Sequence, residues 1–158
     1  MRIAGYNPNS FVDFPGNIAA IVFVGGCNLR CWYCHNAEIL DTKEFLSDDA
    51  ILARIKDNFL LDGVVISGGE PTLQPDLFDF AEKLRSIGMQ VKLDTNGMRP
   101  EVVKEGVERG LFDYVAMDVK APFEKYYRFR RRALPTPRSS ARPPRISWDR
   151  TGSRTSSA

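Results

Sequence analysis

The sequence predicts an α/β fold with a parallel sheet, formed by one domain over residues 1–127. Three observations predict it. Short apolar runs rich in β-branched residues end in glycine or polar loops, segments with helical spacing follow these loops, and 43% of the 158 residues are apolar, which suffices for one core. Such alternation predicts parallel strands joined by right-handed crossovers, with functional loops at the carboxyl ends of the strands.

The first strand and the first helix lie on either side of a cysteine-rich loop. Residues 18–24, IAAIVFV, predict a buried strand that enters a loop at Gly25-Gly26. A helix is predicted from Ser47, because an N-cap serine precedes two acidic residues in the first turn. Its apolar residues recur at helical spacing: Ile51, Leu52, Ile55 and Phe59.

The same pattern repeats twice and ends in one more strand. After Gly63 the run VVIS predicts a strand closed by Gly68-Gly69, with a helix over residues 75–87. Residues 89–94, MQVKLD, predict the third strand, which is followed by the loop TNGMRP and a helix over 101–109. Residues 114–119 predict a fourth strand, which gives four strands alternating with three helices.

Residues 128–158 differ in composition from everything before them. They hold nine arginines, one acidic residue and no lysine, a local charge of +8, so that residues 1–127 carry −6 of the net +2. Without apolar periodicity this tail is expected to be disordered, or to be a frameshifted or truncated C-terminus. Although a basic tail can bind nucleic acid, we do not expect a nucleic-acid partner, because the change is so abrupt.

Nothing in the sequence predicts a membrane protein. The longest clean apolar run is residues 18–24, far short of the roughly 20 residues that a spanning helix needs, and the N-terminus lacks a basic-then-apolar leader. We therefore expect a cytoplasmic protein.

The three cysteines form the pattern Cys27-x3-Cys31-x2-Cys34 within eight residues. This is too tight for a disulfide framework and favours metal or redox chemistry. Three thiolates on one loop can hold a cubane iron–sulfur cluster but supply one ligand fewer than its four irons need. One iron is thus left open to bind a small molecule.

Two structural interpretations of these cysteines compete with an iron–sulfur cluster. His35, the only histidine, could complete a zinc site, although structural zinc sites usually pair cysteines in two separated knuckles and adjacent Cys34 and His35 would strain to share one ion. The cysteines could also be unligated core residues, but such cysteines rarely cluster in this way. Both are less favoured than the cluster.

A strand that enters CNLRCWYC, with Tyr33 directly before the last cysteine, resembles the radical S-adenosylmethionine (SAM) superfamily. The resemblance implies a [4Fe–4S] cluster on Cys27, Cys31 and Cys34, with SAM on the open iron and Tyr33 near its adenine. One strand later, Gly68-Gly69-Glu70 is similar to the family's GGE motif, which binds the methionine amino group. Alone, a Gly-Gly pair before a helix would indicate only a turn between a strand and a helix.

Two further strand ends resemble segments of glycyl-radical-enzyme activases. Asp94-Thr95-Asn96-Gly97 is similar to their DTNG segment, and Asp118-Val119-Lys120 to their D-x-K segment. The resemblance implies that Asp94, Thr95, Asp118 and Lys120 lie around the carboxylate and ribose of SAM, with a monovalent cation in some members. In isolation either segment could be a helix cap or a turn.

The N-terminal Asp13-Phe14-Pro15-Gly16 and the CHN at residues 34–36 resemble the anaerobic ribonucleoside-triphosphate reductase activating proteins. This implies reductive cleavage of SAM to a 5′-deoxyadenosyl radical, which forms a glycyl radical on a partner such as anaerobic ribonucleoside-triphosphate reductase. Reduced flavodoxin or ferredoxin is the implied electron donor. The implied fold is a six-unit partial (β/α) barrel, of which residues 1–127 supply about four units.

Two other functions stay open. One is a short radical SAM synthase that acts on a small molecule, similar to 7-carboxy-7-deazaguanine synthase. The other is an inactive, truncated fragment that binds a cluster and performs no catalysis.

Overall fold

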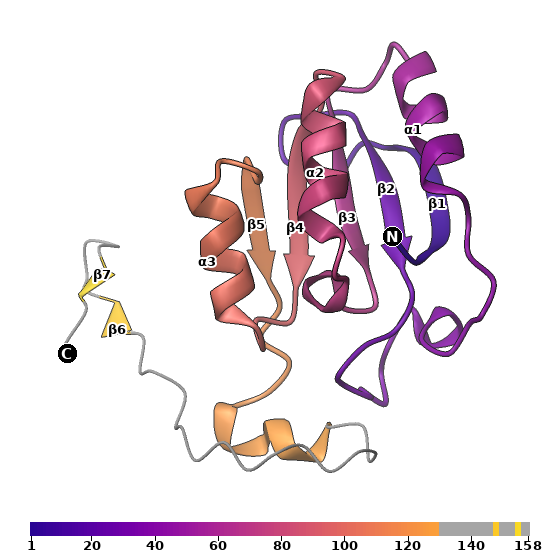
Figure 1. The fold of residues 1–158 in the computed structure, drawn as a ribbon. Helices are drawn as coiled ribbons and strands as arrows, with labels where there is room; N and C mark the ends of the chain where they lie inside the picture. The colour runs from indigo at the N-terminus through magenta and orange to yellow at the C-terminus, as the bar shows by residue number, and fades with distance from the viewer. Residues whose placement is uncertain (130–146, 149–153, 156–158) are drawn as a thin grey trace.

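Five strands form one sheet in the order β1–β2–β3–β4–β5 in the computed structural model, which describes residues 1–129, 147–148 and 154–155 (Figure 1). The strands are β1 Ile3–Ser10, β2 Ala19–Val24, β3 Gly63–Gly68, β4 Gln90–Thr95 and β5 Tyr114–Met117. Strands β2 to β5 pair in parallel, as predicted, and β1 pairs antiparallel with β2. The fold is therefore α/β with a mostly parallel sheet.

Three α-helices lie on one face of this sheet, α1 Asp48–Asp57, α2 Leu77–Ser86 and α3 Pro100–Glu108 (Figure 1). The predicted cap is confirmed, because the Ser47 hydroxyl accepts the amide of Ala50 at 3.5 Å. The prediction for Phe59 is wrong. The helix ends at Asp57, since the next residue, Asn58, turns to donate its side-chain amide to the carbonyl of Pro8, and Phe59 is 91% exposed.

Strand β1 was not among the predicted elements. Its sequence, IAGYNPNS, contains glycine, asparagine and proline, which are rare in central strands and tolerated at an edge. The register with β2 shifts between Ile3 and Gly5 and again between Asn7 and Ser10, so the strand lacks regular alternation.

The core has two parts, one on each face of the sheet. The larger part packs the inner face of the sheet against the helices, with Val22, Ile66 and Leu93 completely buried between them. The smaller part lies on the opposite face and contains Phe14, Ala19, Ile21 and Val65, with Phe23 packed against it. Because both faces are covered, β2 and β3 are continuously apolar, as expected for buried parallel strands.

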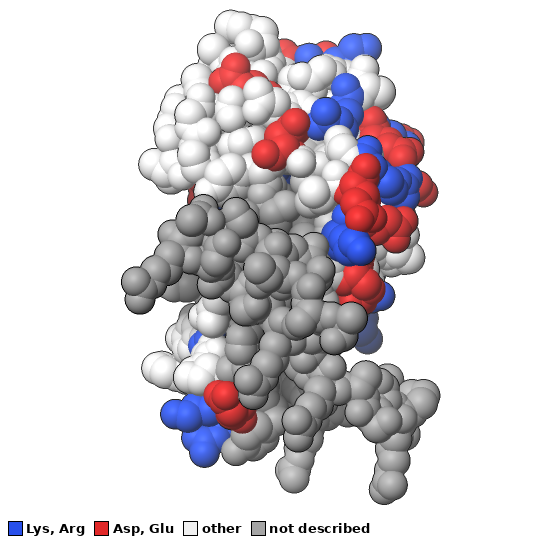
Figure 2. Space-filling view, turned by 90° about the vertical axis from the view of Figure 1, so that its left-hand side faces the viewer, with Lys and Arg blue, Asp and Glu red and all other residues white. Residues whose placement is uncertain are grey.

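Charged residues gather over the helices. Figure 2 shows most of the Lys, Arg, Asp and Glu side chains of that view on its right-hand side, which is the helical side of Figure 1. Exposed ion pairs lie there: Arg109 pairs with Glu82 of α2 at 2.5 Å, and Lys104 pairs with Glu108 within α3 at 3.6 Å. Such exposed pairs add little to stability.

Three short helices and two very short strands complete the described part. They are η1 Ala37–Ile39, η2 Pro71–Leu73 and η3 Phe123–Arg128, with β6 Ser147–Trp148 antiparallel to β7 Arg154–Thr155. The predictions of disorder or a frameshift for residues 128–158 fall mostly outside the described residues. Within the described ranges no helix is long and apolar enough to cross a membrane.

Candidate functional site

The cysteine loop, residues 27–34, leaves the carboxyl end of β2 through Gly25-Gly26. Gly26 has φ +84°, a value that favours glycine and turns the chain sharply. Leu29 is 2% exposed and anchors the loop in the protein. Arg30 pairs with Asp41, and the amide of Cys34 donates to the carbonyl of Cys31 at 3.1 Å. The loop is thus folded around a buried leucine.

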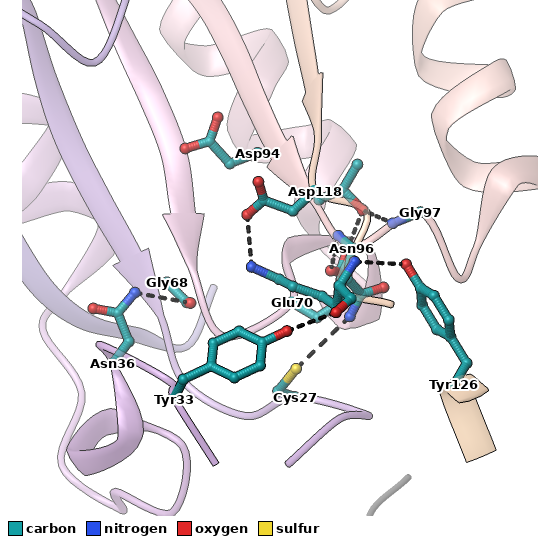
Figure 3. A network of polar contacts seen from close by, with 12 residues as sticks. Cys27, Tyr33, Asn36, Gly68, Glu70, Asp94, Asn96, Gly97, Asp118 and Tyr126 are labelled. Atoms are coloured by element: carbon teal, nitrogen blue, oxygen red, sulfur yellow. Dashed lines mark hydrogen bonds and ion pairs between the residues drawn. The ribbon is translucent and has the colours of Figure 1, made fainter. Parts of the chain in front are cut away.

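The loop forms one wall of a cavity of about 360 Å³ at the carboxyl ends of the parallel strands. The ends of β3, β4 and β5 supply the other walls (Figure 3). Ten of the eleven site residues predicted from the sequence line it, namely Cys27, Cys31, Tyr33, Cys34, Gly68, Gly69, Asp94, Thr95, Asp118 and Lys120. The exception is Glu70.

The donor set of this cavity fits an iron–sulfur cluster. Cys27, Cys31 and Cys34 are all free thiols that border the same space, as a three-cysteine cluster loop requires. Among the described residues, no group of three or more His, Cys, Asp or Glu side chains is placed to hold a single metal ion. His35 also borders the cavity.

Burial acts on the ionisation of two thiols of the cysteine loop. Burial raises the pKa of Cys27, and the backbone amide of Leu29 only partly offsets this. Burial also raises the pKa of Cys31, against the opposing charge of Lys120. Since metals bind the thiolate form, any metal bound by these two cysteines would have to displace a proton from each of them.

The glycines after β3 bring two strand ends into direct backbone contact. The Gly69 amide donates to the carbonyl of Val24 at 2.8 Å, and the next amide, of Glu70, donates to the carbonyl of Gly26 at 2.9 Å. A Cβ on Gly69 would lie 1.9 Å from that Gly26 oxygen. Gly68 and Gly69 thus have two roles: they hold the cysteine loop and expose backbone to the cavity.

Glu70 lies behind the cavity wall and is completely buried. Its carboxylate accepts hydrogen bonds from the amide and hydroxyl of Thr72 at 3.1 and 2.5 Å. It also accepts from the Thr95 hydroxyl at 2.7 Å and from the Asn96 amide at 2.8 Å. The carboxylate was expected to meet an ammonium group in the site, but here it joins the loops that follow β3 and β4 (Figure 3).

The two aspartates of the site each lie beside a lysine. Asp94 at the end of β4 pairs with Lys92 at 2.7 Å, and Asp118 after β5 pairs with Lys120 at 2.7 Å. Burial works against the charge of Lys120, yet the hydrogen bond and charge of Asp118 leave its pKa raised, so this lysine is a cation at neutral pH. The cavity therefore carries both signs of charge at the strand ends.

Tyr33 connects the cysteine loop to the segment after β5. Its hydroxyl donates to the carbonyl of Lys120 at 2.8 Å, while the amide of Lys120 donates to the Tyr126 hydroxyl at 3.0 Å. The amide of Arg30 also donates to the carbonyl of Phe129, at 2.6 Å. Tyr33 thus borders the cavity and also makes a structural contact that the sequence did not reveal.

Two asparagines of the cavity were missed by sequence reasoning. Asn36 donates its side-chain amide to the carbonyl of Gly68 at 3.2 Å, and Asn96 reaches the cysteine loop from the end of β4. Asn96 belongs to the DTNG segment, residues 94–97. An Asn-Gly pair is so common in turns that the asparagine does not by itself indicate a site residue. The position of that segment at a strand end was the available signal.

Comparison with known proteins agrees with this geometry. Residues 21–138 match the family model described as the Radical SAM superfamily. A protein of Methanocaldococcus jannaschii assigned as a glycyl-radical enzyme activating enzyme is 43% identical over 129 residues, which is 80% of this chain and 53% of that protein. The pyruvate formate-lyase 1-activating enzyme of Escherichia coli K12 is 34% identical over 75% of this chain and 52% of its own.

A third relative has a different type of name. The 7-carboxy-7-deazaguanine synthase of Neisseria meningitidis serogroup B is 35% identical over 71% of this chain and 48% of its own length. The chain thus spans about half the length of each of these curated relatives.

Proposed function

The chain belongs to the radical SAM superfamily, and on that basis we propose that it carries the cluster and SAM site of a glycyl-radical-enzyme activase. One observation carries the proposal: the three cysteines and the strand-end loops predicted for such a site border a single cavity. The activase names of two relatives support it further.

In the proposed function Cys27, Cys31 and Cys34 would hold a [4Fe–4S] cluster and leave one iron without a protein ligand, available to SAM. When bound and reduced, the cluster would supply the electron for reductive cleavage of SAM to methionine and a 5′-deoxyadenosyl radical. The chain's own part is to bind and orient: the backbone of Gly68 and Gly69 faces the amino group, and Lys120 offers its positive charge to the carboxylate.

Tyr33, Asp94, Thr95 and Asp118 complete the proposed pocket, with the aspartates toward the ribose and Tyr33 toward the adenine. Glu70 does not line the cavity; it supports the cavity by holding together the segments after β3 and β4 through hydrogen bonds. A monovalent cation is part of the proposal, as in some of the activases that the sequence resembles. In this structure Lys92 and Lys120 pair with the carboxylates of Asp94 and Asp118.

The proposed partner is a glycyl radical enzyme such as anaerobic ribonucleoside-triphosphate reductase, with reduced flavodoxin or ferredoxin as the electron donor. The Asp13-Phe14-Pro15-Gly16 and Cys34-His35-Asn36 segments support this choice of partner. Because the chain spans about half of its relatives, the radical transfer is proposed for the whole protein of which this site is a part.

Two measurements on one preparation test the proposal. The protein is reconstituted anaerobically with iron and sulfide, reduced, and given SAM, and 5′-deoxyadenosine is quantified. A candidate glycyl radical enzyme is then added, and electron paramagnetic resonance is recorded. We expect 5′-deoxyadenosine and a glycine-centred doublet, both absent from Cys31→Ala.

Each other outcome points to one of the alternatives. Cleavage of SAM without a doublet on any candidate partner would contradict the activase function and favour a synthase, as the deazaguanine synthase relative suggests. A loaded cluster that never cleaves SAM would favour the inactive cluster-binding fragment.

A further inference from the structure

Asn96 connects the loop after β4 to the cysteine loop. It is 7% exposed, and its side-chain amide donates to Asn28 Oδ1 at 2.8 Å. The same amide nitrogen lies 3.8 Å from Cys27 Sγ, within the reach of a hydrogen bond to sulfur. Figure 3 shows Asn96 above Cys27, with the contact drawn between them. One amide group therefore touches both Cys27 and its neighbour.

The position of this amide is determined from both sides. The backbone N–H of Asn96 donates to Glu70 at 2.8 Å, and its Oδ1 accepts the amide of Met98 at 3.0 Å. The oxygen of the side chain is thus used in a local turn, which leaves the NH₂ group directed at the cysteine loop. A continuous set of hydrogen bonds runs from Glu70 through Asn96 to Cys27.

Cys27 also receives a second donor, because the amide of Leu29 lies 3.3 Å from its sulfur. N–H groups aimed at a sulfur ligand stabilise negative charge on it, and hydrogen bonds to the sulfurs are one of the factors that set the reduction potential of iron–sulfur clusters. A reduced cluster carries one more negative charge than an oxidised one. Donors at Cys27 therefore favour the reduced state.

We propose that Asn96 is a positioning residue for Cys27, which holds this sulfur in place and raises the reduction potential of the cluster through its side-chain amide. The inference rests on the proposed function only in that Cys27 binds a cluster. It assigns a role to a residue outside the set predicted for SAM binding, and it gives the Glu70 carboxylate a second purpose.

The test is the midpoint potential of the reconstituted cluster, measured without SAM or a partner by redox titration and electron paramagnetic resonance. The variant is Asn96→Ser, whose hydroxyl can still accept the Met98 amide but cannot reach the sulfur. At the wild-type midpoint potential we expect the ratio of reduced to oxidised cluster to fall severalfold, with iron and sulfide content retained.

Asn28→Ala is the complementary variant, since it frees the Asn96 amide to donate to sulfur alone. We expect its potential to equal or exceed that of the wild type, and this variant decides the question if Asn96→Ser cannot be loaded. Asn58→Ala is the matched control, because this asparagine precedes β3 at the end of the sheet away from the cavity. It should leave the potential unchanged.

An unchanged potential in a loaded Asn96→Ser protein would overturn the inference, as would a lowered potential in Asn28→Ala. Failure of the proposed function has a different signature. The wild-type protein would then hold no cluster, or would hold one that does not cleave SAM.

Discussion

At the scale of single residues, Glu70 is an acidic side chain that is completely buried. An isolated carboxylate in such a place would be very costly, but here four donors of the chain satisfy its two oxygens. The donors come from the segment after β3 and from the end of β4. Glu70 therefore contributes to folding before any cofactor arrives.

We predict that Glu70→Gln destabilises the protein even without cluster or SAM. The amide would direct an NH₂ group at donors, leaving at least one of them unpaired, and we expect the free energy of unfolding to fall by about 2 kcal/mol or more. Urea denaturation of the apoprotein measures this.

Glu82→Gln is the matched control, because Glu82 is about half exposed and pairs with Arg109 at the surface. We expect Glu82→Gln to lower the free energy of unfolding by less than about 1 kcal/mol. Equal stability of Glu70→Gln and the wild type would show that the carboxylate serves the cofactor alone.

The sequence predicted which residues lie near one another better than how their side chains are oriented. Cysteine spacing and polar groups at strand ends indicated a set of residues of which ten border one cavity, because parallel strands bring their carboxyl ends together. Whether Glu70 faces the cavity or the interior depends on the positions of Thr72, Thr95 and Asn96. That information lies in the packing of β3 against β4, which spacing along the chain does not contain.

At the scale of elements, the turn after β1 closes the second face of the sheet. Phe14 is 3% exposed and packs with Ile21 and Val65, whereas Phe11 in the same turn is 73% exposed. The side chain of Asp13 accepts the hydroxyl of Ser10, which fixes the course of the turn. The Asp13-Phe14-Pro15-Gly16 segment thus also covers the smaller part of the core, through Phe14.

We predict that Phe14→Ala lowers the free energy of unfolding by about 3–5 kcal/mol, the usual cost of removing a buried aromatic ring. Phe11→Ala, three residues away, should change it by less than about 0.5 kcal/mol. Chemical denaturation of the two apoproteins compares them directly. Similar losses in both variants would contradict the packing described for Phe14.

The contact between β3 and the cysteine loop predicts a severe effect for Gly69→Ala. The new methyl group would overlap the carbonyl of Gly26, so the loop would have to move away, and we expect a loss of about 3 kcal/mol or more together with failure to retain a cluster. Thermal unfolding and iron content measure the two effects.

Gly5→Ala is the control, since a Cβ on Gly5 meets only the Phe23 side chain at an ordinary 3.5 Å. It should cost less than about 1 kcal/mol. A stable, cluster-loaded Gly69→Ala protein would show that the strand end can adapt.

Helices and central strands were predictable because their signals are local. Ser47 marks the start of α1, apolar runs mark β2 and β3, and alternating Val91 and Leu93 mark β4. Strand β1 was not predictable in this way. The asparagines and the proline of β1 are typical of loops. This segment forms a strand because it pairs with the edge of β2.

At the scale of the whole molecule, the proposed cluster site would couple proton release to cluster binding. The pKa values of Cys27 and Cys31 are raised by burial, so both are thiols at neutral pH in the apoprotein. Each must lose its proton to bind iron. Lower pH therefore opposes loading, and higher pH favours it.

We predict that the fraction of chains loaded at limiting iron and sulfide rises steadily from about pH 6.5 to about pH 8.5. Loading should also raise the melting temperature, because the cluster binds only the folded chain. Anaerobic reconstitution followed by iron analysis and calorimetry measures both. A loading curve that is flat over this range would mean that the thiols are already ionised.

The contacts that close the cavity are long in sequence: Asn96 lies 69 residues after Cys27, and Lys120 lies 87 residues after Tyr33. A ribosome delivers the chain from its N-terminus, so the cysteines emerge well before the groups that cover them. During this interval the thiols are open to oxygen and to stray metal ions. The complete cavity, and with it the proposed cluster site, can therefore form only after residue 120 has left the ribosome.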